Sequence, residues 1–454
     1  MVNTVPKKQF VLLGGDILLI VLSIYLAPVL RFGVFPDWTA LLDWPDVASI
    51  FIYLLGLYIF DFYNLEEKFR TAAYALRFLV AIVAADLFIA TLFYAFNVRP
   101  YGSILFVFNT LLIFSFCLGW RLLHYQWDRT NRKIYRVMIL GAGRAGSELQ
   151  RMLARRDDFS VEGFLDDDAA KQGSRIGGVS VLGKTDLLKT FLDRIDLIVV
   201  AITGVLNQGL YRQLVKAKMQ GVAVYEMPTF YERVLEKIPV RHVSDLWLVS
   251  VPMSGVRKSI YNQKIKKIFD KFLSLLGLLI SLPIIFVTIV AIKLDSKGPI
   301  FYKQMRVGHK GRIFELIKFR SMRIDSEVNG AVWAEKNDPR VTRVGRLIRL
   351  LRFDEIPQFW NVLKGDMSLV GPRPERPEFV RELIEEIPYY SLRHAVAPGI
   401  TGWAQVNYSY GASKEDALAK LEYDLYYIKN LSPLLDMLIL ARTVRTVLFG
   451  RGAR

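Results

Sequence analysis

The chain has 454 residues, too many for one compact domain and enough for two or three. It is 52% hydrophobic with a mean hydropathy of +0.27, yet it carries 60 lysines and arginines and a net charge of +17. This combination favours a membrane protein that lies against anionic lipid or binds anionic substrates; nucleic acid is disfavoured because the basic residues flank apolar segments. The single cysteine, Cys117, excludes an intrachain disulfide, and the four scattered histidines lack zinc-site spacing.

Residues 1–130 are predicted to form a four-helix transmembrane domain. Apolar runs occupy residues 10–30, 47–62, 76–96 and 103–123. Each is about long enough to cross the hydrocarbon core of a bilayer, and the first is too long, and too soon followed by others, to be a cleaved signal peptide. Lysines and arginines flank both ends of this group and the loop between the second and third runs. The positive-inside rule therefore places both ends of the bundle in the cytoplasm.

Two acidic residues, Asp16 and Asp86, lie within the first and third apolar runs. An ionisable residue inside a membrane span suggests a function by default. We find no basic partner for either residue within the runs, so we expect both to make hydrogen bonds between helices.

Residues 131–255 are predicted to form a Rossmann-like domain. A buried strand is followed by GAGRAG, with Gly141, Gly143 and Gly146, and a second strand ends at Asp166. Further parallel strands are predicted at 196–202 and 221–227. This is the dinucleotide fingerprint in its expected setting, with an acidic residue at about the right distance. Because the domain lacks a YxxxK pair, we favour an accessory or ligand-sensing role, with an unknown ligand, over nucleotide-dependent chemistry.

A fifth apolar run covers residues 268–294 and has strongly basic flanks on both sides. The positive-inside rule then requires both flanks on the cytoplasmic side, which a straight span cannot satisfy. Ser281 and Pro283 lie near the middle, where proline removes a backbone hydrogen bond and kinks a helix. We therefore predict a re-entrant helix over residues 265–294, broken at this point; a kinked spanning helix is the alternative.

The stretch LLRFDEIPQFWNVLKGD, residues 350–366, places two carboxylates, Asp354 and Glu355, among basic residues. Asp354 is predicted to be the N-cap of a short helix, with Pro357 in its first turn and Lys364-Gly365 at its end. The positive end of a helix suits a phosphate or a metal–phosphate complex. A well-capped helix with no such role is the alternative.

Four stretches carry a resemblance to a known family. They are GPIFYKQMRVGHKGRIFELIKFRSM (298–322), DPRVTRVGRLIRLLRFDEIPQFWNVLKGDMSLVGPRPE (338–375), PGITGWAQVN (398–407) and LEYDLYYIKNLS (421–432). From about residue 258 to 450 the chain resembles the bacterial sugar transferases, which are monotopic polyprenyl-phosphate glycosyl-1-phosphate transferases. The whole layout is similar to the long, exopolysaccharide-type form of the family and, more weakly, to its exosortase-associated subgroup.

The resemblance implies a fold and a reaction. The fold class is membrane α plus α/β, with a catalytic module at residues 256–454. Such enzymes transfer a sugar 1-phosphate from a UDP-sugar to undecaprenyl phosphate, release UMP, and start exopolysaccharide repeat-unit assembly. We expect glucose as the sugar, the bacterial inner membrane as the location, with the middle and catalytic domains on its cytoplasmic face, and a homodimer as a plausible state.

The resemblance also assigns roles to residues. Asp354 would be the nucleophile that forms an aspartyl-phosphosugar intermediate, which agrees with the use of carboxylates as covalent catalysts. Glu355 would help to hold Mg²⁺, a metal that neutralises phosphate charge. The remaining assignments are phosphate binding by Lys318, Arg349, Arg373 and Arg393, substrate contact by Gln405, and metal binding by Asp354, Glu355 and Asp424.

The chain departs from the family pattern at two places. Ser281 stands one position earlier than the serine of the family's Ser-Pro break, so a different geometry is expected at the broken helix. Ala397 stands before PGITG where many members have a basic residue, so one phosphate contact is missing or is supplied by Arg393.

Two other function classes remain as alternatives. A membrane-bound nucleotide-sugar dehydratase or epimerase would need a catalytic tyrosine–lysine pair in the Rossmann-like domain, and that pair is absent. A non-catalytic scaffold or sensor of a polysaccharide assembly complex would show no sugar-phosphate transfer.

Overall fold

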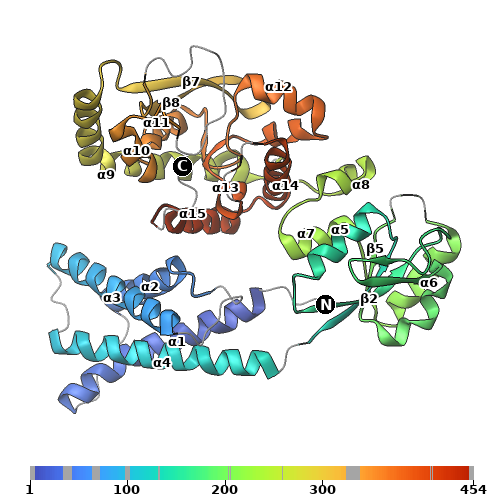
Figure 1. Ribbon diagram of the computed structural model, residues 1–454. Helices are drawn as coiled ribbons and strands as arrows, with labels where there is room; N and C mark the ends of the chain where they lie inside the picture. The colour runs from blue at the N-terminus through green and yellow to red at the C-terminus, as the bar shows by residue number, and fades with distance from the viewer. Residues whose placement is uncertain are drawn as a thin grey trace. The chain divides into compact units, whose positions relative to one another are not determined.

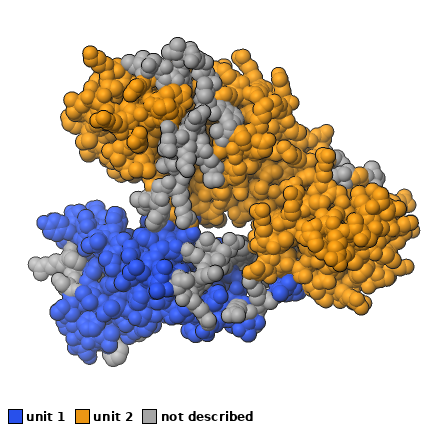
Figure 2. All heavy atoms as spheres, in the orientation of Figure 1, with its two compact units in different colours: residues 1–135 blue, residues 136–454 orange. Residues whose placement is uncertain are grey.

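The computed structural model describes residues 6–33, 43–63, 72–97, 103–130, 133–202, 204, 206–257, 259–323, 338–408, 411 and 413–448 (Figure 1). Contacts among these residues divide the chain into two compact units, Met1–Tyr135 and Arg136–Arg454 (Figure 2). Each unit is described by itself below.

The first unit consists of apolar helices. Its helices are α1 (Pro6–Phe32), α2 (Trp44–Ile59), α3 (Ala72–Ala95) and α4 (Ser103–Thr130). In the described part of the chain, α1, α3, α4 and the later helix α9 (Lys266–Asp295) are long and apolar enough to cross a membrane, whereas α2 is shorter. Helix α1 packs against α4 and α2 packs against α3, around a core that contains Phe62, Phe78 and Ile113.

A buried ion pair joins α1 to α4. Both oxygens of Asp16 accept hydrogen bonds from the Arg121 guanidinium, with 2.7 Å between Nη2 and Oδ2, and both side chains are fully buried. The expectation that Asp16 has no basic partner was therefore wrong, because the packing of α4 along α1 brings together two charges that are 105 positions apart. A buried charge needs such a partner to offset its lost hydration.

The second acidic residue of this unit behaves as predicted. The Asp86 carboxylate on α3 accepts hydrogen bonds from Thr110 Oγ1 of α4, at 2.6 Å, and from the Tyr53 hydroxyl of α2. Asn109 Nδ2 donates to the same tyrosine oxygen at 3.2 Å. The predicted hydrogen bonding between helices is confirmed for Asp86.

Replacing Arg121 with methionine would leave Asp16 buried without its partner. We expect a loss of about 3–5 kcal/mol in the free energy of unfolding, the usual cost of breaking a buried pair. The measurement is the Tm of the full chain in detergent. The double replacement Asp16→Leu with Arg121→Met removes both charges and should recover most of the loss; a single variant that melts like the wild type would contradict the pair.

The second unit begins with a six-stranded sheet in the order β3-β4-β2-β1-β5-β6. Its strands are β1 (Tyr135–Leu140), β2 (Phe159–Leu165), β3 (Arg175–Ile176), β4 (Val179–Gly183), β5 (Leu197–Val200) and β6 (Ala223–Glu226). The pairs β1–β5, β5–β6 and β2–β4 are parallel. The short strand β3 pairs with β4 in the antiparallel direction. With helices α5 (Arg144–Leu153), α6 (Gln208–Met219) and α7 (Met227–Leu235), this is a Rossmann-like arrangement, in green in Figure 1.

The rest of the second unit forms a mixed α/β module, in yellow to red in Figure 1. It contains an antiparallel hairpin of β7 (Phe301–Val307) and β8 (Ile313–Phe319), and a parallel pair of β9 (Ser368–Val370) and β10 (Gly399–Thr401). Its helices, besides α9, are α8 (Asp245–Ser250), α10 (Arg343–Leu350), α11 (Gln358–Lys364), α12 (Pro377–Glu386), α13 (Trp403–Asn407), α14 (Lys414–Asn430) and α15 (Pro433–Leu448).

The linker between the sheet and the module is part of the module's core. Ile238, Val240 and Trp247 pack in one cluster with residues of α13 and α14. The indole of Trp403, which is 1% exposed, donates a hydrogen bond to the Glu236 carbonyl at 2.9 Å. The predicted domain boundary at residue 255 thus falls after a segment that the catalytic module buries.

Helix α9 continues without interruption through Pro283, so the predicted break in helical structure is not seen. Proline removes one backbone hydrogen bond but does not require a helix to end. The same module binds both ends of α9. Near the first end, Lys266 pairs with Asp436 of α15 at 2.7 Å and Asp270 accepts from Ser368 of β9 at 2.6 Å. At the other end, Asp295 accepts a hydrogen bond from the Val344 amide of α10 at 3.2 Å.

Candidate functional site

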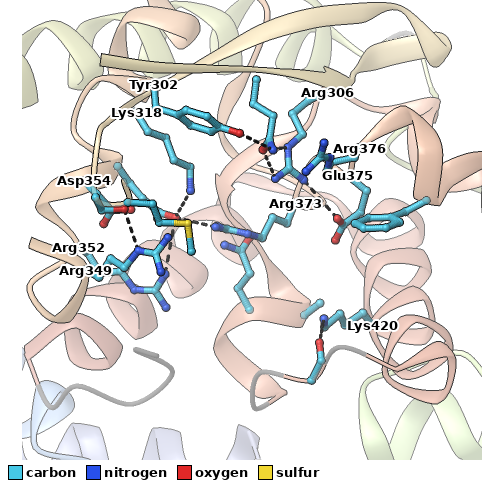
Figure 3. Close-up of a pocket in the computed structure, with 18 of the residues that line it drawn as sticks. Tyr302, Arg306, Lys318, Arg349, Arg352, Asp354, Arg373, Glu375, Arg376 and Lys420 are labelled. Carbon is cyan, nitrogen blue, oxygen red and sulfur yellow. Dashed lines mark hydrogen bonds and ion pairs between the residues drawn. The ribbon is translucent and has the colours of Figure 1, made fainter. Parts of the chain in front are cut away.

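A cavity of about 450 Å³ opens in the second unit (Figure 3). The β7–β8 hairpin, the turn that holds Asp354 and Glu355, the GPRPE loop at 371–375, and helices α12 and α14 contribute its walls. Arginines and lysines dominate the lining, and its carboxylates are Asp354, Glu355, Glu375 and Asp424. Such a surface suits a polyanionic ligand.

The carboxylate pair lies in a turn between two helices. Arg352 has a left-handed backbone, with φ of +59°, and follows the end of α10. Asp354 and Glu355 then form a single 3₁₀ turn, and α11 begins after Pro357. The prediction that Asp354 is the N-cap was therefore wrong, because the left-handed residue inserts this extra turn before the helix. The predicted helix end is confirmed, since Gly365 caps α11 with φ of +92°.

Glu355 is surrounded by cations. Its Oε1 lies 2.6 Å from Arg373 Nη2, 3.0 Å from Lys318 Nζ and 3.7 Å from Arg352 Nη1. Burial alone would raise the pKa of the Glu355 carboxyl, but Arg373, Lys318 and Arg352 together hold that pKa well below its usual range. Glu355 is therefore ionised at neutral pH.

Asp354 has the opposite electrostatics. It is 7% exposed, and burial raises the pKa of its carboxyl; Lys318 opposes this rise and the charge of Glu355 adds to it. Two neighbouring carboxyls with pKa values shifted in opposite directions are typical of sites where the two groups have different chemical roles.

Three of the predicted phosphate ligands gather around this pair. Lys318 comes from β8, Arg349 from α10 and Arg373 from the GPRPE loop, and Figure 3 shows all three in the same cavity as Asp354. Arg349 Nε donates to Ser321 Oγ at 2.8 Å, which fixes the direction of its guanidinium. The sequence analysis missed Arg352, although it stands only two positions before Asp354.

The other predicted site residues lie deeper in the wall. Arg393 is 6% exposed and donates to Asp424 Oδ2 at 2.8 Å and to the Arg373 carbonyl at 2.9 Å. Gln405 donates through Nε2 to the Ile400 carbonyl at 2.9 Å, while its Oε1 is buried without a hydrogen-bond partner among the described residues. Both line the cavity, and Nη1 and Nη2 of Arg393 already donate to protein atoms.

The predicted three-carboxylate metal set is not assembled. In the residues that the structure describes, no group of three or more histidine, cysteine, aspartate or glutamate side chains could hold a metal ion. The metal role of Asp424 stays a prediction; in the structure this residue is 1% exposed and is the ion-pair partner of Arg393. Burial raises the pKa of Asp424 to about 6, although Arg393 acts in the opposite direction.

Asp354 and Glu355 alone still fit a magnesium ion. Mg²⁺ is commonly held by one or two carboxylates together with substrate phosphates rather than by a cage of protein ligands. Asp354 and Glu355 are the carboxylates that would hold such an ion beside the substrate phosphates.

Comparisons with known proteins decide the family. A model of the bacterial sugar transferase family matches residues 261–450, and one of a CoA-binding domain matches residues 58–228. The undecaprenyl-phosphate glucose phosphotransferase of Komagataeibacter xylinus is 32% identical over 438 residues, which are 93% of this chain and 76% of that protein. The chain belongs to the bacterial sugar transferase family.

Two further relatives match shorter parts of the transferase. The UDP-N-acetylgalactosamine-undecaprenyl-phosphate N-acetylgalactosaminephosphotransferase of Aeromonas hydrophila is 44% identical over 243 residues, 54% of this chain. The UDP-glucose:undecaprenyl-phosphate glucose-1-phosphate transferase of Escherichia coli is 43% identical over 204 residues, 43% of this chain. The transferase spans 56% and 42% of the lengths of these two relatives. The matches and the apolar helices identify a membrane protein.

The glycine fingerprint of the transferase forms a tight strand-to-helix turn. Gly141 has φ of +102°, and a Cβ on Gly146 would lie 2.0 Å from the Gly141 carbonyl oxygen, so both positions require glycine. Gly143 precedes the first turn of α5. The Asp166 carboxylate accepts a hydrogen bond from the Ala142 amide at 2.7 Å and therefore ties the loop to β2. A nucleotide ligand at these residues stays a prediction.

The opposite pKa shifts predict opposite effects of neutralising each carboxylate. Glu355→Gln should lower the free energy of unfolding by on the order of 3 kcal/mol, because it leaves Lys318 and Arg373 crowded without their anion. Asp354→Asn, its matched control, should leave stability unchanged or raise it, because the folded chain favours an uncharged group there. Thermal unfolding of the full chain in detergent measures both.

The cost of Glu355→Gln should depend on pH. The ionised Glu355 stabilises the fold above its ordinary pKa, and this contribution is lost only as the pH falls through the lowered pKa of the folded state. The wild type and Glu355→Gln should therefore differ at neutral pH and converge in acid. Equal stability of the two chains at pH 7 would contradict the ion cluster.

Proposed function

We propose that the transferase moves a sugar 1-phosphate from a UDP-sugar to undecaprenyl phosphate, releases UMP, and so begins the assembly of an exopolysaccharide repeat unit. The observation that carries this proposal is a buried aspartate beside a mostly buried glutamate, in a cavity lined by the cations that a diphosphate needs. The names of the relatives reported above support the same reaction class.

The first step is a displacement at phosphorus by Asp354. A carboxylate oxygen of Asp354 attacks the phosphorus that carries the sugar, the bond from this phosphorus to the bridging oxygen breaks, and the electron pair leaves with UMP. An aspartyl-phosphosugar remains on the enzyme. Arg373, Lys318 and Arg349 offset the charge that grows on the phosphate oxygens. The raised pKa of Asp354 makes its ionised form more nucleophilic than an exposed carboxylate.

The second step returns the enzyme to its starting state. A phosphate oxygen of undecaprenyl phosphate attacks the same phosphorus, the bond to the Asp354 oxygen breaks, and a diphosphate-linked lipid leaves. Glu355 and Asp354 are the residues that would hold Mg²⁺. When bound, this metal would neutralise the diphosphate and make UMP a better leaving group.

The donor proposed is UDP-glucose. The relative that matches over 93% of the chain is named a glucose phosphotransferase, which favours glucose. The Aeromonas hydrophila relative, named for N-acetylgalactosamine, makes UDP-N-acetylgalactosamine the competing donor.

Purified full chain in nanodiscs with Mg²⁺ and undecaprenyl phosphate should release UMP from one member of a panel of UDP-sugars. Asp354→Asn should reduce this release by at least about 10³-fold, because it removes the nucleophile. Since this variant is expected to remain as stable as the wild type, its loss of activity would report chemistry rather than unfolding. Equal activity of the two chains, or no UMP from any donor, would reject the reaction.

We also propose that α9 bends at Pro283 while remaining helical, so that it enters the membrane and returns to the side from which it came, with both cytoplasmic domains on the inner face of the bacterial inner membrane. The attachment of both ends of α9 to one module supports this topology. A helix that crossed the membrane would place its two ends on opposite sides.

Cysteine labelling tests the topology of α9. In a Cys117→Ser background, Ile260→Cys and Lys297→Cys place one exposed thiol beyond each end of α9. Membrane-impermeant maleimide should label both in inside-out vesicles and neither in right-side-out vesicles. Labelling of the two positions from opposite sides would instead establish a spanning helix.

A further inference from the structure

The GPRPE loop, residues 371–375, is held by its carbonyl groups. Four consecutive carbonyls accept hydrogen bonds, each at 2.9–3.0 Å: Pro372 from the Gly399 amide, Arg373 from Arg393 Nη2, Pro374 from Arg306 Nη1 and Glu375 from the Val307 amide. Backbone amides supply two of these bonds, and two arginine side chains supply the others.

The composition of the loop explains this arrangement. Pro372 and Pro374 have no N–H group, so the loop cannot bind its neighbours through amides at these positions. Their rings restrict φ at two of five residues, and the bound carbonyls fix the remaining freedom. The result is a rigid turn that joins the end of strand β9 to the start of helix α12.

Both arginines are themselves fixed on the side away from the loop. Arg306 binds Gln304 Oε1 through Nη2 at 2.6 Å and through Nε at 3.0 Å. Arg393 binds Asp424 Oδ2 at 2.8 Å and the Tyr390 hydroxyl at 2.5 Å. A guanidinium held in this way could turn toward a phosphate only by leaving buried partners unpaired, which is costly.

The loop has one direct contact with the carboxylate pair. Arg373 Nη2 lies 2.6 Å from Glu355 Oε1, while the Arg373 carbonyl points back to Arg393. The backbone bonds therefore fix the main chain from which the Arg373 side chain reaches Glu355.

We propose that Arg306 and Arg393 are positioning residues that aim Arg373, and that Asp424 acts by holding Arg393 rather than by binding a metal ion. This inference rests on the proposed function in one respect, since Arg373 is taken to contact the diphosphate of the donor. It assigns Arg393 a role different from the phosphate contact that the family resemblance implies.

The test is the binding of UDP to the full chain in nanodiscs, measured by calorimetry in EDTA, so that neither turnover nor metal contributes. Arg306→Met, Arg393→Met and Arg373→Met should each weaken binding by about tenfold. In the Arg373→Met background the same replacements should have almost no further effect, because the residue through which they act is gone. Arg393→Lys keeps a charge beside Asp424 and a donor for the carbonyl, and should recover most of the affinity.

A matched control comes from Arg320. This residue is 5% exposed, lines the same cavity and also donates to carbonyls, but to those of Ser296 and Lys297. Any effect of Arg320→Met should add to that of Arg373→Met. Additive losses for Arg306→Met or Arg393→Met would overturn the inference, as would the absence of UDP binding by the wild type.

Asp424 is tested through the metal. Binding of Mn²⁺ in the presence of UDP, followed by electron paramagnetic resonance, should be weakened by Glu355→Gln and unchanged in Asp424→Asn. A loss of Mn²⁺ affinity in Asp424→Asn as large as that in Glu355→Gln would overturn its assignment. These binding results stand apart from sugar transfer: coupling between Arg393 and Arg373 without UMP release from any donor would reject the proposed reaction and keep the positioning role.

Discussion

The ion cluster on Glu355 is the interaction on which the site depends. It joins three segments that are distant in the sequence: the β7–β8 hairpin through Lys318, the turn after α10 through Arg352, and the GPRPE loop through Arg373. Like charges that are partly withdrawn from water repel, so the anion between these cations stabilises their convergence. A phosphate ligand that enters the cavity finds the cations already collected and oriented, which lowers the reorganisation required when charge develops in the reaction.

The same cluster explains why the two adjacent carboxylates, Asp354 and Glu355, can have different chemical roles. Glu355 receives the cations and stays ionised, whereas Asp354 lies in the wall with less compensation and a raised pKa. A reactive group kept in an unfavourable ionised state is a local cost in stability, which the contacts of its neighbour offset. The two carboxylates have different surroundings although they are adjacent in the sequence. Arg352, whose backbone is left-handed, turns the chain just before them.

Much of the fold and of the candidate site could be predicted from the sequence, because the motifs that indicate them are short and local. The glycine fingerprint predicts the strand-to-helix turn, and hydrophobic runs predict the apolar helices, although α2 is shorter than a usual span. Short sequence motifs identified Lys318, Arg349 and Arg373 as phosphate ligands. In the folded chain these residues line the same cavity as Asp354. The sequence analysis did not predict the pairings between distant residues: Asp16 with Arg121, and Arg393 with Asp424. Sequence spacing does not say which buried charges meet, since packing between whole elements decides it. The N-cap at Asp354 failed for a local reason, the positive φ of Arg352, which composition does not reveal for a residue other than glycine.

The segment that joins the Rossmann-like sheet to the catalytic module bears on how such proteins can be recombined. Ile238, Val240 and Trp247 belong to the module's own core, and the Ile238 amide donates to the Glu422 carbonyl of α14 at 3.0 Å. Lys237 pairs with the Glu422 side chain at 2.8 Å. A gene exchange that cut the chain at residue 256 would carry the catalytic residues but leave a hydrophobic groove and an unpaired glutamate where the linker had been. In this chain the packed core of the catalytic module therefore includes residues from about 236 onward, inside what the sequence presents as the neighbouring domain.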